Sequence, residues 1–231
     1  MSERRDSALR RLEQALGYVF RDHSLIERAL NHRSAAGRSN ERLEFLGDAV
    51  LDTVVSAQLI AKFPDADEGV LSRLRASLVR DKSLGALASD LCIGELIRLG
   101  SGELKSGGSR RNSILADALE ALFGAVFLDG HYVAAEAVIL HVFESRLAEL
   151  RLDAARKDAK TRLQEWLQSH GSALPAYRLL DTRGEPHKQT FYVGCEVDEQ
   201  QATRGEGSSR RMAEQRAAAA MLEQLTGETA E

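Results

Sequence analysis

Residues 40–51 read Asn-Glu-Arg-Leu-Glu-Phe-Leu-Gly-Asp-Ala-Val-Leu. The acids Glu41, Glu44 and Asp48 in this stretch are spaced i, i+3, i+7, so on an α-helix they fall within roughly a 60° arc. The opposite side carries the apolar stripe of a core-facing helix, made of Leu43, Leu46, Val50 and Val54. The pattern therefore predicts a core helix that gathers three carboxylates away from the core.

Two interpretations of this acidic face remain open. Like charges three or four positions apart oppose helix formation by roughly 0.2 to 0.5 kcal/mol per pair. A solvated helix face would simply carry that penalty, whereas a bound cation would remove it. Phe45 projects beside the acids and off the core stripe, where an aromatic side chain is costly unless another surface covers it. Its position favours an interface over a plain solvated face.

A second helix, predicted over residues 112–128, repeats the design. Asp117 and Glu120 stand at i, i+3, opposite a core stripe made of Leu115, Leu119, Leu122, Phe123 and Val126. Helical bundles build metal sites from inward carboxylates on facing helices. Oxygen ligands without His or Cys in the pattern favour Mg²⁺ or Mn²⁺ over Zn²⁺.

The two acidic segments resemble the motifs of a known family. Residues 40–51 look like the signature of the ribonuclease III family, and Ser113 to Glu120, Ser-Ile-Leu-Ala-Asp-Ala-Leu-Glu, is similar to its second acidic motif. The resemblance extends over nearly the whole chain. It implies a metal-dependent endoribonuclease that hydrolyses double-stranded RNA to 5′-phosphate and 3′-hydroxyl ends, processing ribosomal and other structured RNA precursors. It implies Mg²⁺ as the cofactor, with Mn²⁺ as a possible substitute.

The same resemblance assigns roles to individual residues. It implies a metal-binding set made of Glu44, Asp48, Asp117 and Glu120. Within that set Asp48 and Glu120 are expected to be catalytic, and Glu120 to be essential. Glu41 and Glu68 are expected to be supporting acids, although Glu68 could equally be a first-turn acid that the helix dipole favours. Phe45 is expected to be a dimer contact, since a two-fold dimer supplies two sites for the two strands.

Before residue 150 the apolar residues recur at helical spacing and no strand-like alternation occurs, so the first domain, residues 1–150, is expected to be all-α. Ser24 is a plausible N-cap, and residues 82–99 are expected to be helical. The Gly-rich stretch 100–111 reads as a flexible basic loop, which the resemblance assigns to RNA contact. The charged segment 151–158 is expected to be the interdomain linker.

The second domain, residues 159–226, changes periodicity. Its expected elements are a helix at 160–170, strands at 176–182, 190–197 and 200–205, and a helix at 209–225. This α-β-β-β-α order, a small α+β fold, resembles the double-stranded-RNA-binding domain. The resemblance implies RNA contacts through Gln164 in the first helix, His187 in the loop between strands, and the arginine pair Arg210 and Arg211. Free N–H groups at the start of the last helix also favour phosphate there.

Composition limits these expectations. The chain has 231 residues, of which 43% are hydrophobic and 29% charged, with a formal net charge of -4. Nucleic-acid binders are usually basic, so RNA binding requires locally clustered cations, with the acids committed to metal. From Asp158 to Leu225 nine Lys or Arg stand against ten Asp or Glu. Met212 and Glu214 stand where the general form of this domain is more basic, which predicts weaker RNA binding and a shallower salt dependence.

The location of the chain is expected to be cytoplasmic. Its N-terminus is charged and lacks a signal-like apolar region, and there is no uninterrupted apolar run of about 18 residues. Cys92 and Cys195 fall in different predicted domains without metal-like spacing, which favours reduced thiols. The expected partners are double-stranded RNA and a second copy of the chain, with no membrane and no small-molecule cofactor beyond the metal.

Two other functions remain possible from the sequence. The chain could be a dimer that coats double-stranded RNA without cutting it, and an RNA duplex bound but left intact in Mg²⁺ would favour that function. It could also carry purely structural acids and act on another protein. In that case Mg²⁺ would leave its thermal stability unchanged.

Overall fold

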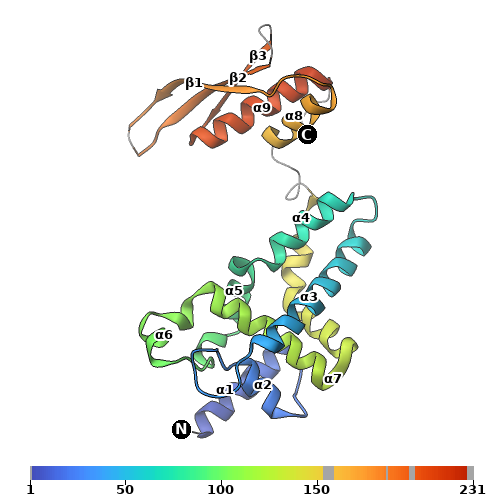
Figure 1. Ribbon diagram of the computed structural model, residues 1–231, viewed down its shortest axis with the longest axis vertical. Helices are drawn as coiled ribbons and strands as arrows, with labels where there is room; N and C mark the ends of the chain where they lie inside the picture. The colour runs from blue at the N-terminus through green and yellow to red at the C-terminus, as the bar shows by residue number, and fades with distance from the viewer. Residues whose placement is uncertain (1, 153–158, 186, 198–200, 228–231) are drawn as a thin grey trace. The chain divides into compact units, whose positions relative to one another are not determined.

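The computed structural model describes residues 2–152, 159–185, 187–197 and 201–227 (Figure 1). The chain divides into two compact units, residues 1–155 and 156–231. Most of the predicted linker, residues 153–158, lies outside the described residues. The limits 1–150, 151–158 and 159–226 therefore stay a prediction.

The first unit is helical, as predicted. Its helices are α1 (Ser2–Leu16), α2 (His23–Ala29), α3 (Glu41–Lys62), α4 (Glu68–Val79), α5 (Asp81–Asp90), α6 (Ser101–Lys105) and α7 (Asn112–Glu149). Among its described residues lie also the 3₁₀ turns Ile93–Glu95 and Gly108–Arg110. Residues 82–99 are thus helical only in part, and stretch 100–111 holds a short helix and a 3₁₀ turn instead of a plain loop.

Helices α3 and α7 form the centre of this unit. At their crossing, a Cβ atom on Gly47 would overlap the carbonyl oxygen of Glu120, and one on Gly124 would overlap the carbonyl oxygen of Leu43. Only glycine at these two positions allows the backbones to approach so closely. The core around the crossing consists of leucine, isoleucine, valine, alanine and phenylalanine side chains, contributed mainly by α1 to α5 and by α7.

Helix α7 changes direction at His131, whose backbone is in the left-handed region (φ 61°). Just before this kink, the Asp129 carboxylate accepts hydrogen bonds from the Tyr18 hydroxyl (2.7 Å) and from the Arg21 N–H (2.8 Å). These bonds tie the last turn of α7 before His131 to the segment that follows α1. By length and hydropathy alone α7 could cross a bilayer. Its buried residues from Ile114 to Phe143 fill the helical core instead.

Local capping explains where α2 begins. The Asp22 carboxylate accepts a hydrogen bond from the Ser24 N–H at 2.9 Å, so Asp22 is the N-cap and the prediction of Ser24 was wrong. Asp and Ser are both strong N-cap residues. Which of the two caps α2 depends on the residue at which the backbone turns from the α1–α2 loop into the helix. The sequence pattern alone does not specify that residue.

The second unit has the predicted α-β-β-β-α order. Its elements are α8 (Ala159–Ser169), β1 (Ala176–Arg183), β2 (Thr190–Val197), β3 (Gln201–Gly207) and α9 (Arg210–Thr226). The strands form an antiparallel sheet in the order β1-β2-β3. Alternate residues of β2, Val193, Cys195 and Val197, are buried, and Figure 1 shows α8 and α9 on one side of the sheet. The Ser209 hydroxyl caps α9 by accepting from the Met212 N–H.

Candidate metal centre and RNA-facing residues

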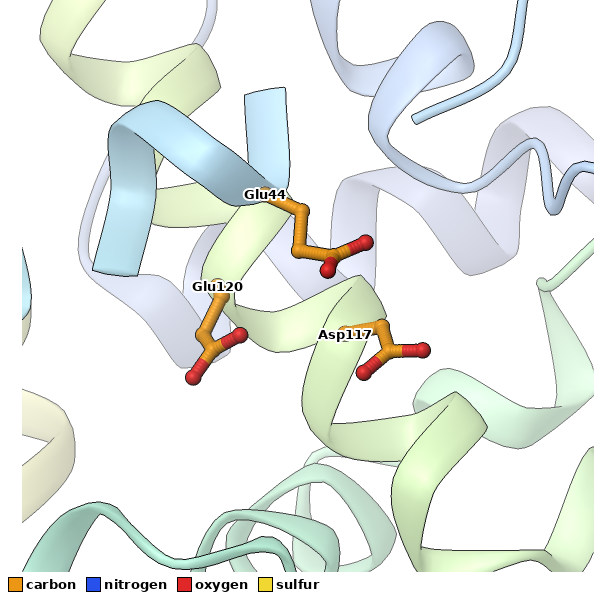
Figure 2. A group of neighbouring side chains, drawn as sticks. All are labelled: Glu44, Asp117 and Glu120. Atoms are coloured by element: carbon orange, nitrogen blue, oxygen red, sulfur yellow. The ribbon is translucent and has the colours of Figure 1, made fainter. Parts of the chain in front are cut away.

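The α3–α7 crossing brings three of the predicted acids together. Glu44 lies one turn before Gly47 on α3, and Glu120 lies one turn before Gly124 on α7, with Asp117 a further turn back. One carboxylate oxygen from each of Glu44, Asp117 and Glu120 lies within 4.8 Å of the other two. Figure 2 shows the three side chains projecting into one space from the two helices.

The electrostatics of this cluster are unfavourable without a cation. Burial, followed by the charges of Asp48 and Asp117, raises the pKa of Glu120 to about 8. Burial and the neighbouring acids also raise the pKa of Glu44 and of Asp117. Within the described residues none of the three forms an ion pair.

This donor set fits a divalent ion. Partly buried charges are normally paired or bind metal, and carboxylate oxygens are the ligands that Mg²⁺ and Mn²⁺ prefer. His32 and Arg33 lower the pKa of Asp117, but burial raises that pKa by more. These two neighbours therefore compensate the charge of Asp117 only in part. A cation with two charges would compensate the cluster more fully than these neighbours do.

Asp48, the fourth predicted ligand, is not part of the group of three. It lies one turn after Glu44 on α3 and its side chain is exposed. Its charge is nevertheless the second cause, after burial, of the raised pKa of Glu120. Asp48 therefore lies at the edge of the cluster, and its assignment as a ligand stays a prediction.

The two supporting acids have local partners. Glu41 accepts a hydrogen bond from the Ser39 hydroxyl (2.8 Å) and lies 3.9 Å from the Arg33 guanidinium. Glu68 begins α4, where its Oε1 accepts a hydrogen bond from the Ser72 hydroxyl. Glu41 acts on the cluster by charge, since it contributes to the raised pKa of Glu44, but neither acid joins the group of three.

Asp81 is a neighbour that the sequence pattern missed. It is the first residue of α5, and its charge raises the pKa of both Asp117 and Glu120. An acid at the start of a helix is expected from the macrodipole alone. Glu68 is likewise the first residue of its helix, α4. Nothing in the sequence therefore distinguishes Asp81, whose charge reaches the cluster, from Glu68.

The second unit exposes all four predicted RNA-binding residues. Gln164 lies on α8 and His187 follows the β1 strand, while Arg210 and Arg211 begin α9. These side chains remain predicted contacts.

The two arginines at the start of α9 are not equally available to a phosphate group. Glu214 binds both the Arg210 guanidinium (3.0 Å) and the Lys160 ammonium (2.7 Å). The hydrogen bond from Lys160 is the main reason that the pKa of Glu214 lies below its usual range. Part of the Arg210 charge is therefore already compensated, and Arg211 is the more available phosphate partner.

Phe45 lies on the surface, as predicted. It is 81% exposed, and Leu128 on α7 is 49% exposed. Together with Arg28, Arg42 and Leu46 they line a groove of about 550 Å³. Exposed aromatic and aliphatic side chains that are grouped together and bordered by charged residues are a feature of surfaces that a partner covers.

Comparisons with known proteins cover both units. Residues 22–147 match a family model described as ribonuclease-III-like, and residues 159–225 match the double-stranded RNA binding motif. The chain is 55% identical to Ribonuclease 3 of Pseudomonas fluorescens (strain SBW25), over 93% of this chain and 94% of that protein. It is 52% identical to Ribonuclease 3 of Hahella chejuensis, over 91% and 93%.

Solved structures resemble the first unit. The crystal structure of the nuclease domain of ribonuclease III from Campylobacter jejuni matches with a TM-score of 0.59 and 43% identity, over 62% of this chain and 97% of that chain. A second structure of that nuclease domain matches with a TM-score of 0.57 and 46% identity, over 58% and 95%. That second structure is described as flexible in a region involved in dimer formation.

The raised pKa of Glu120 predicts how metal-free stability depends on pH. Because the folded pKa of about 8 lies above that of an ordinary glutamate, the folded state holds more protons than the unfolded state between those two values. The unfolding free energy contributed by this group therefore falls as pH rises through that range. We expect the melting temperature in EDTA to fall from pH 6 to pH 8.5, and to fall less in Glu120→Gln. Equal pH dependence in both proteins would contradict the assignment.

Proposed function

Because the chain belongs to the ribonuclease III family, we propose that the carboxylate cluster on α3 and α7 is its catalytic centre. The chain is an endoribonuclease for double-stranded RNA and uses a divalent metal ion. The observation that carries the assignment is the meeting of Glu44, Asp117 and Glu120 within 4.8 Å, without a paired cation among the described residues. Asp48 completes the proposed ligand set from the edge of the cluster.

The proposed ion is Mg²⁺, with Mn²⁺ as a substitute, because the donors are all carboxylates. Bound there, such an ion supplies a water of lowered pKa and compensates charge on the scissile phosphate. The protein residues provide the geometry. Glu120 and Glu44 hold the ligand oxygens from two helices whose separation is fixed by Gly47 and Gly124. Because its pKa is raised to about 8, Glu120 would give up its proton to act as a ligand for a cation at this site.

The second unit is proposed to hold the duplex by its shape. Double-stranded RNA is recognised across its minor groove through 2′-hydroxyls and phosphates, over roughly 16 base pairs. Gln164 and His187 are suited to hydroxyl and base-edge contacts, and Arg211, more than Arg210, to phosphate. Products with 5′-phosphate and 3′-hydroxyl ends, processing of ribosomal and other structured precursors, and a cytoplasmic location follow from the family and belong to the same proposal.

A two-fold dimer is proposed because a duplex has two strands to cut. The exposed Phe45 supports it, since its side chain lines a groove together with Leu46 and Leu128. The reference to dimer formation in the Campylobacter jejuni nuclease domain supports the same arrangement here.

Cleavage of a long, labelled RNA duplex tests the catalytic centre. In Mg²⁺ the chain is expected to produce short duplex fragments, and EDTA to abolish them. Glu120→Gln is expected to lower the cleavage rate by at least about a hundredfold, because it removes a ligand charge. Glu144→Gln, an exposed acid on the same helix, is the matched control and should cut normally.

Two outcomes would count against this function. A duplex that is retarded on a gel but never cut would mean that the chain binds RNA without hydrolysing it. Equal activity of Glu120→Gln and Glu144→Gln would place the catalytic centre elsewhere.

Dimer formation is tested by Phe45→Ala. We expect the substitution to weaken self-association by about 2 kcal/mol or more, as truncation of a buried aromatic anchor does at interfaces. Sedimentation velocity over a dilution series measures the change. Val133→Ala removes another exposed apolar side chain (76% exposed) and serves as the control. An unchanged sedimentation profile for Phe45→Ala at low concentration would refute the dimer contact.

A further inference from the structure

A second charged surface lies on the first unit, at the junction of α4 and α5 beside the end of α7. It is a groove of about 560 Å³. Four of its lining residues are cationic, Arg80, Lys82, Arg146 and Arg151. Among the described lining residues a single acid, Glu149, opposes them. We call this surface the basic groove.

Hydrogen bonds hold the walls of the basic groove together. The Arg146 guanidinium on α7 donates to the Ser83 hydroxyl on α5 at 2.7 Å, and Ser83 is buried. The Lys62 ammonium from α3 donates to the carbonyl oxygens of Leu147 and Ala148. Lys62 therefore lies at the negative end of the α7 dipole and helps to compensate it.

The other three cations of the basic groove point their charge to solvent. Arg80, Lys82 and Arg151 are exposed, and none forms an ion pair in the part of the chain that the structure describes. Glu149 lies in the same groove without pairing to them. In a chain whose formal net charge is -4, three such cations around one groove are a local excess that favours an anionic ligand.

The start of α5 links the basic groove to the carboxylate cluster. Asp81 stands between the groove residues Arg80 and Lys82. The same helix packs against the start of α7, where a Cβ atom on Gly85 would lie 2.8 Å from the Cα atom of Asn112, and the charge of Asp81 reaches Asp117 and Glu120 further along α7. The start of α5 therefore borders both surfaces. An RNA strand lying over the carboxylates needs further phosphate contacts nearby, because the acids themselves repel its backbone.

We propose that the basic groove binds the phosphodiester backbone of the RNA duplex beside the point of cleavage. This assignment rests on the proposed function. Arg151 and Lys82 supply exposed charge, while Arg146, fixed by Ser83, supplies a guanidinium of defined orientation for phosphate oxygens. Such contacts position the duplex without reading its sequence.

The test is RNA binding by Lys82→Gln/Arg151→Gln in the full chain. Binding to a short RNA duplex is measured in EDTA, which prevents cleavage, at several KCl concentrations. Because each cation that neutralises a phosphate contributes about one unit to the slope of log K against log salt, the slope should become shallower by about one to two. Affinity at low salt should fall about 3- to 30-fold. Arg4→Gln/Arg10→Gln removes two exposed cations from α1, at the other end of this unit (Figure 1), and should change neither quantity.

Unchanged affinity and slope in Lys82→Gln/Arg151→Gln, relative to the α1 control, would overturn the assignment. The charge-conserving Lys82→Arg/Arg151→Lys should bind like the unaltered chain, and weaker binding there would also overturn it. Thermal unfolding verifies that all variants are folded. If the unaltered chain itself neither binds nor cuts the duplex, the proposed function fails. If the unaltered chain binds and cuts the duplex, and the groove variants match the α1 control in affinity and salt dependence, the groove assignment alone fails.

Discussion

The backbone contact between α3 and α7 at Gly47 and Gly124 is the constraint on which the rest of the structure depends. No side chain separates the two helices there, and each glycine lies one turn from an acid of the cluster, Glu44 on α3 and Glu120 on α7. The distance between the carboxylates is therefore set by a rigid, buried contact instead of by flexible side chains. Preorganised ligands of this kind are what a metal site requires, because the geometry must be held before the ion arrives.

The cost of the arrangement is electrostatic. Three partly buried carboxylates repel one another, and the pKa of Glu120 is raised first by burial and then by the charges of neighbouring acids, Asp48 among them. Burial of the apolar side chains of the helical core around the crossing offsets this electrostatic cost. The chain separates its charges in space: acids gather at the crossing, while cations lie in the basic groove and at the start of α9. A net charge of -4 is thus compatible with RNA as the substrate.

Periodicity in the sequence predicted the parts that depend on one helix at a time. The spacing of Asp117 and Glu120, the acidic face of residues 41–48 and the strand alternation of residues 190–197 follow directly from helix and strand geometry. Contacts between elements were not predictable in this way. Gly47 looks like a weak position within a helix, and only the crossing explains it. Asp81 has a first-turn position that the helix dipole favours for any acid, so the sequence does not mark it as a neighbour of the cluster. Asp48 is exposed at the edge of the cluster, because the rotation of α3 against α7 depends on tertiary packing.

The central claim, that this crossing builds a divalent metal site, is tested most directly by anomalous diffraction from crystals of the chain soaked in Mn²⁺. We expect an anomalous peak at ligand distance from carboxylate oxygens of Glu44, Asp117 and Glu120. The peak should be absent in Glu120→Gln crystals treated in the same way. A peak at another group of residues, or well-ordered crystals without a peak at the cluster, would contradict it.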